Sequence, residues 1–264
     1  MLGGNGNTLQ LIQITLRMLR ELQCKLPVEV WHLPGELNMD DETALRELGA
    51  IPRDFGEPGV VIPMKEVKGR EKNFQIKVAA WVNSAFEEII GLDSDVMAIR
   101  DPSYLFETEE YKRTGQIFWP DWWKTHPSNT TPDCCVLMTD NPVWDIVDSQ
   151  CKDEWEQESG EVVYNKRRNW EYPHHALSIV CLQNSALMLA SYFSQNSELY
   201  FQLLNGDKDL LRFAHKALKK EYFMNRFPTA GGAIFENRFC GFAFVPTLLP
   251  MYLTYRSNTI RPTG

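Results

Sequence analysis

An α/β fold, with a mainly parallel central sheet flanked by helices, is predicted for this chain from three observations. Helical and strand-like hydrophobic patterns alternate along the sequence. The chain has 264 residues, 44% of them hydrophobic, which is enough for one large core. The strand-like segments are short apolar runs, as expected when helices cover both faces of a sheet. We therefore expect one α/β domain.

The first third of the chain supplies three helical patterns and two apolar runs. Leucine and isoleucine recur at helical spacing over residues 9–22, and an apolar run at 28–33 follows Pro27. Residues 40–48 begin with an acidic first turn and end at a glycine, which is typical of a helix. Residues 60–62 are apolar, and residues 78–85 again mark one helical face.

The remainder adds three strands and a helix. Residues 89–92, 115–119 and 161–164 are apolar runs that predict strands. Residues 209–218 carry Leu210, Phe213, Ala214 and Ala217 on one helical side. This alternation predicts helices packed on both faces of the sheet.

Two aspartates one residue apart, Asp93 and Asp95, follow the predicted strand 89–92 in the segment IIGLDSDVMAI. Ligands of open α/β sheets bind at the carboxyl ends of strands, and two converging carboxylates can hold Mg²⁺ or Mn²⁺ against a diphosphate. The alternative is a turn in which each aspartate caps a backbone N–H group. A second such pair occurs at Asp207 and Asp209, so spacing alone leaves both interpretations open.

Charge, cysteine content and hydropathy exclude several classes of protein. With 35 acidic and 27 basic side chains, the net charge of −8 argues against nucleic-acid binding, which needs clustered lysine and arginine. The six cysteines form no C-x-x-C pair, so they predict neither a zinc ribbon nor a thioredoxin-type site. The sequence contains no run of 18 apolar residues, the length that would predict a membrane-spanning helix. Asn129 begins a glycosylation sequon that has meaning only in the secretory pathway.

Three segments in order resemble the fungal Golgi alpha-mannosyltransferases that extend mannan chains on glycoproteins through alpha-1,3 or alpha-1,2 linkages. They are LDSDVMAIRDPSYLFETEEYKRTGQIFWPDWW (residues 92–123), ESGEVVYNKRRNW (158–170) and GDKDLLRFA (206–214). Three ordered motifs are far more specific than one D-x-D. The resemblance implies a GT-A fold and a single catalytic domain over residues 1–264, without the N-terminal anchor and first strand of full-length relatives.

The same resemblance implies a retaining transferase that uses GDP-mannose and Mn²⁺ or Mg²⁺. The full-length protein would be a type II membrane protein of the Golgi lumen that acts on a mannosylated glycoprotein. We expect no nucleic-acid partner. We expect contact with a membrane only through an anchor that is absent from this chain. The metal would neutralise charge on the departing GDP and so act as a Lewis acid.

The resemblance assigns the metal and donor residues. Asp93 and Asp95 match the metal-binding pair, and Ser94, between them, would lie at the donor. Lys77 falls where the family has a lysine in the helix before the D-x-D strand, where it would offset phosphate charge; a surface lysine is the alternative. Lys208, in the third motif, is also expected to contact the donor.

The catalytic and acceptor residues come from the other two motifs and from the segment FWPDWW. Asp207 would contact the transferred mannose, with Asp209 orienting it, although a helix N-cap at Asp207 is the alternative. Glu158 is the candidate for the reacting centre, against an exposed glutamate in an acidic run. Strand 115–119 is followed by Asp121, Trp122 and Trp123, and we expect these side chains to contact the acceptor or the transferred sugar.

Departures from the family pattern leave alternatives open. Related enzymes often use a C-terminal histidine as a third metal ligand, but no histidine follows His215, and Phe242 stands where some relatives carry one. Residues 171–184 lengthen the segment between the second and third motifs; their adjacent His174 and His175 point apart on a regular element and predict no shared metal site. A transferase that uses a UDP-sugar and a non-catalytic glycan- or nucleotide-binding relative are the two alternatives.

Overall fold

The computed structural model describes residues 2–3, 7–64, 74–125, 139–169, 185–204 and 206–226, together with the backbone of five short strands between residues 229 and 254. Within this part of the chain, no helix combines the length and apolar character needed to cross a membrane.

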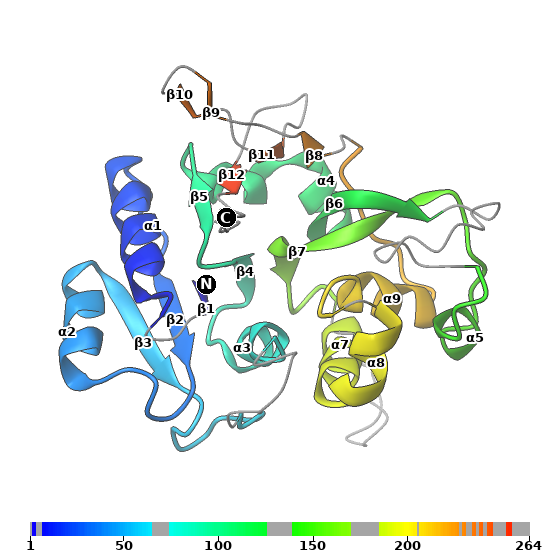
Figure 1. The fold of residues 1–264 in the computed structure, drawn as a ribbon, viewed down its shortest axis with the longest axis horizontal. Coiled ribbons are helices and arrows are strands. Elements are labelled where there is room, and N and C mark those ends of the chain that lie inside the picture. Colours follow the sequence, from blue (N-terminus) through cyan, green and yellow to red (C-terminus); the bar gives the residue numbers. More distant parts are fainter. Residues whose placement is uncertain are drawn as a thin grey trace, which may run out of the picture.

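A six-stranded sheet in the order β3-β2-β1-β4-β7-β6 forms the centre of the molecule (Figure 1). Its strands are β1 (Leu2–Gly3), β2 (Val28–His32), β3 (Ala50–Asp54), β4 (Glu88–Leu92), β6 (Gln116–Thr125) and β7 (Glu154–Asn165). The first four run parallel, and β7 pairs antiparallel with both β4 and β6. The predicted α/β class with a mainly parallel sheet is confirmed. Leu2 and Gly3 form β1, which lies between β2 and β4.

A second sheet joins the segment after β4 to the C-terminal part of the chain. Its order is β5-β12-β11-β8, and β9 and β10 form a separate hairpin. The bounds are β5 (Val96–Ala98), β8 (Thr229–Ala230), β9 (Ile234–Phe235), β10 (Arg238–Phe239), β11 (Phe242–Phe244) and β12 (Tyr252–Thr254). Because Val96 pairs with Thr254, the C-terminal strand lies beside the end of the Asp93–Asp95 turn.

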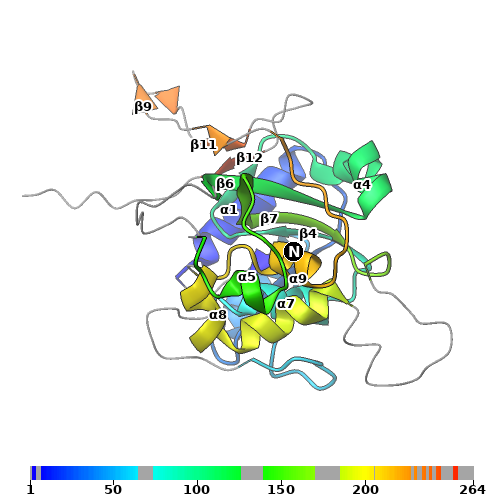
Figure 2. The same cartoon turned by 90° about the vertical axis from the view of Figure 1, so that its right-hand side faces the viewer.

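Helices cover both faces of the central sheet. They are α1 (Leu9–Glu21), α2 (Met39–Glu47), α3 (Ile76–Asn83), the 3-10 helix η1 (Pro102–Glu107), α4 (Glu109–Thr114), α5 (Val143–Ile146), α7 (Ala186–Gln195), α8 (Ser197–Leu204) and α9 (Leu210–Ala217). Figure 2 shows α5, α7, α8 and α9 on one side of strands β6 and β7, with α4 on the other.

Local sequence explains where several of these helices begin and end. Asn38 accepts from the backbone N–H groups of Asp40 and Asp41, and the Asp41 side chain accepts in return from the Asn38 N–H, which makes a capping box for α2. Helix α4 ends at Gly115, whose φ of +75° is the left-handed conformation that glycine adopts without a steric penalty. The sheet strand β6 can therefore start at the next residue.

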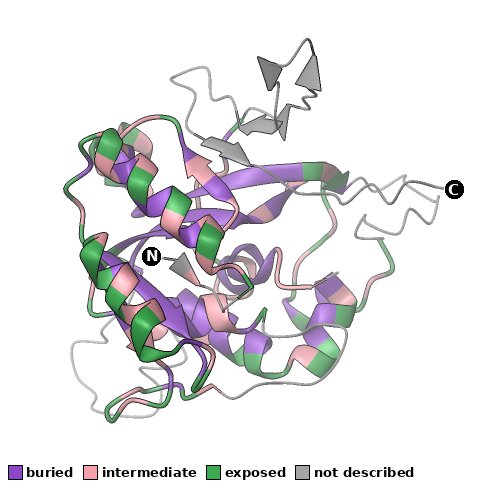
Figure 3. Cartoon of the chain, turned by 60° about the vertical axis from the view of Figure 1, so that its left-hand side comes forward, coloured by how far each residue is buried: buried purple, intermediate pink, exposed green. Residues whose placement is uncertain are grey.

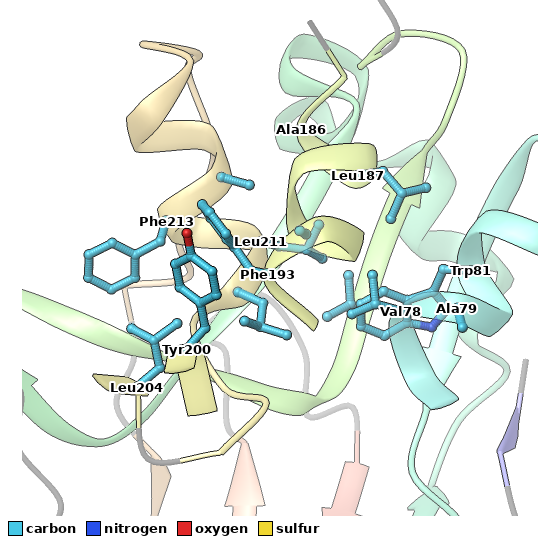
Figure 4. Packing of buried hydrophobic residues seen from close by; sticks show 14 of the residues in the cluster. Val78, Ala79, Trp81, Ala186, Leu187, Phe193, Tyr200, Leu204, Leu211 and Phe213 are labelled. Carbon is cyan, nitrogen blue, oxygen red and sulfur yellow. The ribbon is translucent and has the colours of Figure 1, made fainter. Parts of the chain in front are cut away.

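Two hydrophobic clusters lie on opposite faces of the sheet, and neighbouring strand residues alternate between them. Ile89 and Phe118 pack with α3, α7 and α9, whereas Ile90 and Ile117 pack with α1 and η1. Figure 3 shows the central strands as buried, with exposed residues on the outer sides of the helices. In Figure 4 apolar side chains of α3 and α7 meet those of α8 and α9.

Most predicted elements are confirmed, but strand β7 begins at Glu154, well before the predicted strand 161–164, and other details were also wrong. The strand at residues 50–54 was missed, and the apolar run 60–62 forms no strand. Strand β6 continues to Thr125, so Trp122 and Trp123 lie within it and not past its end. It continues because β7 begins at Glu154 and pairs with β6 from Gln116 to Pro120 and again at Lys124 and Thr125, across two register shifts.

Candidate functional site

The Asp93-Ser94-Asp95 segment is a tight turn between β4 and β5, at the carboxyl end of β4. The Asp93 N–H donates to the Gly160 carbonyl on β7 (2.8 Å), and the Val96 N–H donates back to the Asp93 carbonyl (3.1 Å). Ser94 and Asp95 are both partly exposed. The turn is thus fixed by backbone hydrogen bonds. Side-chain capping is therefore not needed to explain the turn, and the Asp93 carboxylate instead accepts from Lys77.

Lys77 joins three segments that are far apart in the sequence. From α3, its Nζ lies 2.9 Å from each carboxylate oxygen of Asp93, 2.9 Å from Asp207 Oδ2 and 3.1 Å from Ser159 Oγ. The Lys77 side chain is only 17% exposed, so the surface-lysine interpretation is wrong. Burial alone would lower the pKa of Lys77, but the charges of Asp207 and Asp93 raise it above its ordinary value.

Glu158 and Glu161 add two acids to this cluster from strand β7. Glu158 Oε1 accepts from the Gly160 N–H (2.8 Å), and burial, together with the charge of Asp121, raises the pKa of Glu158 to about 7. The exposed-glutamate interpretation is wrong, because Glu158 is mostly buried. Glu161 is 1% exposed, and neither of its oxygens has a hydrogen-bond partner among the described residues. Burial and the charges of Glu158 and Asp93 raise its pKa well above the ordinary value.

Lys208 forms a second charged centre next to the first. Its Nζ lies 3.2 Å from Asp121 Oδ2 and 2.5 Å from Glu156 Oε2, and all three side chains are nearly buried. Burial would lower the pKa of Lys208, but the charges of Asp209, Glu156 and Asp121 raise it. Asp121 also accepts from the Trp122 N–H (2.7 Å), which fixes the carboxylate at the inner end of the exposed part of β6.

Asp209 anchors the loop that carries Asp207 and Lys208. It is fully buried with φ +65°, accepts from the Gln157 N–H (2.7 Å) and pairs with Arg212, which is also fully buried. Arg212 Nη1 lies 3.1 Å from Glu154 Oε1. The residue at the N-cap of α9 is Asp209, so the interpretation of Asp207 as the cap is wrong. These contacts hold Asp207 and Lys208 against β7.

Trp122 and Trp123 lie on β6 beyond Asp121. Trp122 is 44% exposed and Trp123 is partly exposed, whereas Trp119 and Phe118 are core residues. The aromatic segment therefore has a buried half and an accessible half.

A divalent cation suits the charge of the cluster around Asp93, although the described side chains do not by themselves complete a ligand set. Asp95, Asp207, Glu158 and Glu161 all surround the Asp93–Lys77 pair. Burial is the main reason that the pKa values of Glu158 and Glu161 are raised, and the neighbouring carboxylates raise them further. Across the described ranges, however, no group of three or more His, Cys, Asp or Glu side chains is arranged to hold a metal ion. If a metal binds here, Asp93 and Asp95 are the residues placed to hold it.

The histidines do not supply a third ligand within the described residues. His215 is buried, with its ring nitrogens near Tyr164 Oη (3.3 Å) and the Glu221 carbonyl (3.1 Å), and burial lowers its pKa to about 3. The side chain of Phe242, residues His174 and His175, the stretch 171–184 and the sequon at Asn129 lie outside the described part. His215 is therefore a core residue.

Three residues of the site were missed by sequence reasoning. They are Ser159, Glu156 and Glu161. Glu154, Glu156 and Glu158 alternate along β7, and such alternation places side chains on one face of a strand. The alternation was a usable signal, but a run of glutamates is also typical of a solvated surface, and only the pairing with β4 and β6 decides between the two.

Comparison with known proteins gives a consistent family and fold. Residues 1–245 match the model of the mannosyltransferase family Mannosyl_trans3. The alpha-1,2-mannosyltransferase MNN23 of Candida albicans is 25% identical over 90% of this chain and 43% of its own length. The alpha-1,2-mannosyltransferase MNN2 of Saccharomyces cerevisiae is 30% identical over 47% of this chain and 21% of its own length. The chain thus spans less than half the length of these relatives.

Among solved structures, the bifunctional glycosyltransferase WbbM has the same fold. It superposes with a TM-score of 0.51 and 9% identity, over 85% of this chain and 38% of its own length. The GT-A fold implied by the sequence is confirmed.

Proposed function

Since the chain belongs to the Mannosyl_trans3 family of mannosyltransferases, we propose that it transfers mannose from GDP-mannose to a mannose-terminated glycan of a glycoprotein, with retention of the alpha configuration. The observation that carries the proposal is the convergence of Asp93, Lys77 and Asp207 at the carboxyl end of β4. An alpha-1,2 linkage is favoured over alpha-1,3 because the relatives bear that name.

Asp93 and Asp95 would hold Mn²⁺ or Mg²⁺, which supplies charge neutralisation for the departing GDP. Lys77 and Lys208 add positive charge beside this position, where a donor diphosphate would meet them. Ser94 lies in the same turn and would contact the donor. Each lysine is now paired with carboxylates, so donor binding would exchange some of these contacts for contacts to phosphate.

The other side chains would act on the sugars. Asp207 would accept hydrogen bonds from mannose hydroxyl groups and stabilise positive charge at the anomeric carbon. Glu158, with a pKa of about 7, can hold or release a proton near neutral pH, which suits it to the acceptor hydroxyl. Asp209 positions Asp207, while Asp121, Trp122 and Trp123 would border the acceptor.

Calorimetric titration of GDP with and without Mn²⁺, together with a GDP-release assay, tests the assignments. We expect Asp93→Asn and Asp95→Asn to lose Mn²⁺-dependent GDP binding and to reduce transfer by orders of magnitude. Asp207→Asn should keep Mn²⁺-dependent binding but lose turnover, since its proposed partner is the sugar. Asp145→Asn, an exposed aspartate on α5, is the matched control. Unchanged Mn²⁺-dependent binding in both turn variants would refute the metal assignment.

Two alternatives to the proposal, a transferase that uses a UDP-sugar and a non-catalytic binding relative, can be distinguished by experiments with different donors. Thermal-shift measurements with GDP-mannose, UDP-glucose and UDP-galactose, each with Mn²⁺, identify the nucleotide that stabilises the fold. A UDP-sugar as the only stabilising donor would replace GDP-mannose in the proposal. Donor binding without any hydrolysis or transfer would indicate a non-catalytic binding relative.

The location is part of the proposal. A type II anchor upstream of residue 1 would place this domain in the Golgi lumen, where Asn129 could be glycosylated. Protease protection in intact vesicles tests this. Digestion of the domain without detergent would place it in the cytosol.

A further inference from the structure

A cavity of about 360 Å³ lies at the end of strands β6 and β7 where Thr125 pairs with Glu154, apart from the Asp93 turn. It is lined by Trp155 and Tyr222, by the charged residues Asp153 and Arg226, and by Asn225. Its size falls at the small end of ligand pockets in proteins. Glu154, which pairs with Arg212 in the site described above, also lines the cavity, whereas the five residues just named have no role in that site.

The lining has the chemistry of a carbohydrate site. Trp155 and Tyr222 are both partly exposed, and aromatic faces pack against the C–H surfaces of sugar rings. Carboxylate, amide and guanidinium groups beside them offer both acceptors and donors to hydroxyl groups. Lys124 lies 2.6 Å from Asp153, so acidic and basic groups occur together, which suits an uncharged ligand rather than a phosphate or an acidic peptide.

Hydrogen bonds and an ion pair fix two walls of the cavity, strand β7 and the segment after α9. Glu154 lies 2.6 Å from Lys216 Nζ and accepts from Tyr222 Oη (3.4 Å). The segment after α9 is fixed to the sheet, because the Phe118 N–H donates to the Phe223 carbonyl (3.0 Å) and the Asn225 N–H donates to the Phe118 carbonyl (2.8 Å). A fixed wall lowers the ordering cost of ligand binding.

Two strands connect this cavity to the proposed catalytic site. Strand β7 carries Trp155 in the cavity and Glu158 in the site, three residues apart, or roughly 10 Å along a strand. Strand β6 likewise carries Lys124 in the cavity and Asp121 in the site. In a regular strand, residues three apart point to opposite faces, but the register of β6 against β7 shifts between Pro120 and Lys124, which interrupts the alternation between the two positions. An oligosaccharide with its terminal residue near Glu158 could extend along β6 and β7 into the cavity.

We propose that the cavity is an acceptor subsite that binds the inner sugar residues of a manno-oligosaccharide. The inference rests on the proposed function for the identity of the sugar, and on the geometry of β6 and β7 for the location. Trp155 is the main contact, and Arg226 and Asn225 hydrogen-bond the sugar hydroxyl groups.

Isothermal titration of methyl α-mannoside and of α-linked manno-oligosaccharides of two to five residues, without donor, tests the subsite. In the unaltered protein we expect the affinity to rise with the length of the oligosaccharide. The Trp155→Ala variant should bind the longer oligosaccharides about five- to tenfold more weakly. Trp155→Phe, which keeps an aromatic face, should retain most of it. Tyr192→Ala, which truncates an exposed aromatic residue on α7, should match the unaltered chain.

Arg226→Ala removes an exposed side chain and tests the same cavity even if Trp155→Ala does not fold. Affinity independent of ligand length, or unchanged in the Trp155→Ala and Arg226→Ala variants, would overturn the subsite. Donor hydrolysis, measured in parallel, reports separately on the proposed function. Its absence with every nucleotide sugar would refute the transferase proposal, while the titrations would still decide whether the cavity binds glycans.

Discussion

At the residue scale, the unusual feature of this protein is a single ammonium group among several carboxyl groups. Lys77 pairs with Asp93 and Asp207, yet burial and the nearby carboxylates, Asp121 and Asp93 for Glu158, and Glu158 and Asp93 for Glu161, raise the pKa values of both glutamates. Surplus negative charge in a mostly buried place costs stability unless a cation or a proton compensates it. The cluster therefore predicts two measurable responses, one to metal and one to pH.

Removing Lys77 should make the stability of the protein depend on a divalent cation. In Lys77→Met, Asp93 and Asp207 lose their common partner, and breaking such a buried pair costs about 3–5 kcal/mol. Mn²⁺ should restore stability to this variant more than it stabilises the unaltered chain. Urea unfolding with EDTA and with Mn²⁺ measures both effects, and Lys25→Met, at an exposed lysine, is the control. An equal response to Mn²⁺ in all three proteins would place the cation elsewhere.

Glu158 should make the protein less stable as the pH rises towards neutrality. The pKa of its carboxyl group is about 7 in the folded chain, above the ordinary value of 4.5, so its favourable contribution is fully present below pH 4.5 and is lost as the pH passes 7. The stability of Glu158→Gln relative to the unaltered chain should therefore increase from pH 5 to pH 8, on the order of 2–3 kcal/mol. Urea unfolding at both pH values measures this difference, and a constant difference would contradict the raised pKa.

At the scale of the elements, the site depends on how closely α3 approaches the sheet. Lys77 reaches Asp93 and Asp207 from the first turn of α3, and Trp81 of the same helix packs against Gly91 on β4. The helix can come this close because Gly91 has no side chain. Any displacement of α3 would move Lys77 away from both carboxylates.

A methyl group at Gly91 should destabilise the protein and weaken the site. The added Cβ would lie 2.5 Å from Trp81 Nε1, so Gly91→Ala requires α3 to move and should cost about 1–3 kcal/mol. Gly3→Ala is the matched control on the neighbouring strand, where the Cβ would meet Ile76 of the same helix at an ordinary 3.7 Å. Thermal unfolding compares the two variants, and equal losses would show that the close approach of α3 is not the cause.

At the scale of the whole molecule, the sheet makes the two cores one structure. Strand residues one position apart pack into opposite clusters, as Val162 and Val163 do on β7. Neither cluster can therefore lose its strands without exposing the other.

Unfolding of the described core should accordingly be a single cooperative transition. Of the eight tryptophans that fluorescence follows, Trp31, Trp81 and Trp144 lie in one cluster and Trp119 lies in the other, while far-UV circular dichroism follows the backbone. We expect the two urea transitions to coincide. Two separated transitions would instead indicate two independently folding units and contradict the single domain expected from the sequence.

The sequence by itself determined the α/β class, the helices on both sides of the sheet and the position of the Asp93–Asp95 turn. These features depend on local periods and on residues close in the chain, such as the capping box at Asn38 or the apolar run before Asp93. It also selected Lys77 and Asp207 as members of the site, through the resemblance of their segments to a family.

Only the tertiary structure decided what these residues contact. The Lys77 ammonium, the Asp93 carboxylate and the Asp207 carboxylate come from three segments, and no local pattern fixes their separation. The burial of Glu161 follows from the pairing of β7 with β4, because a strand read alone does not say which of its residues face a core. Long-range packing sets the burial of each group and hence its pKa. Sequence reasoning could therefore name residues of the candidate site but not the balance of charge among them.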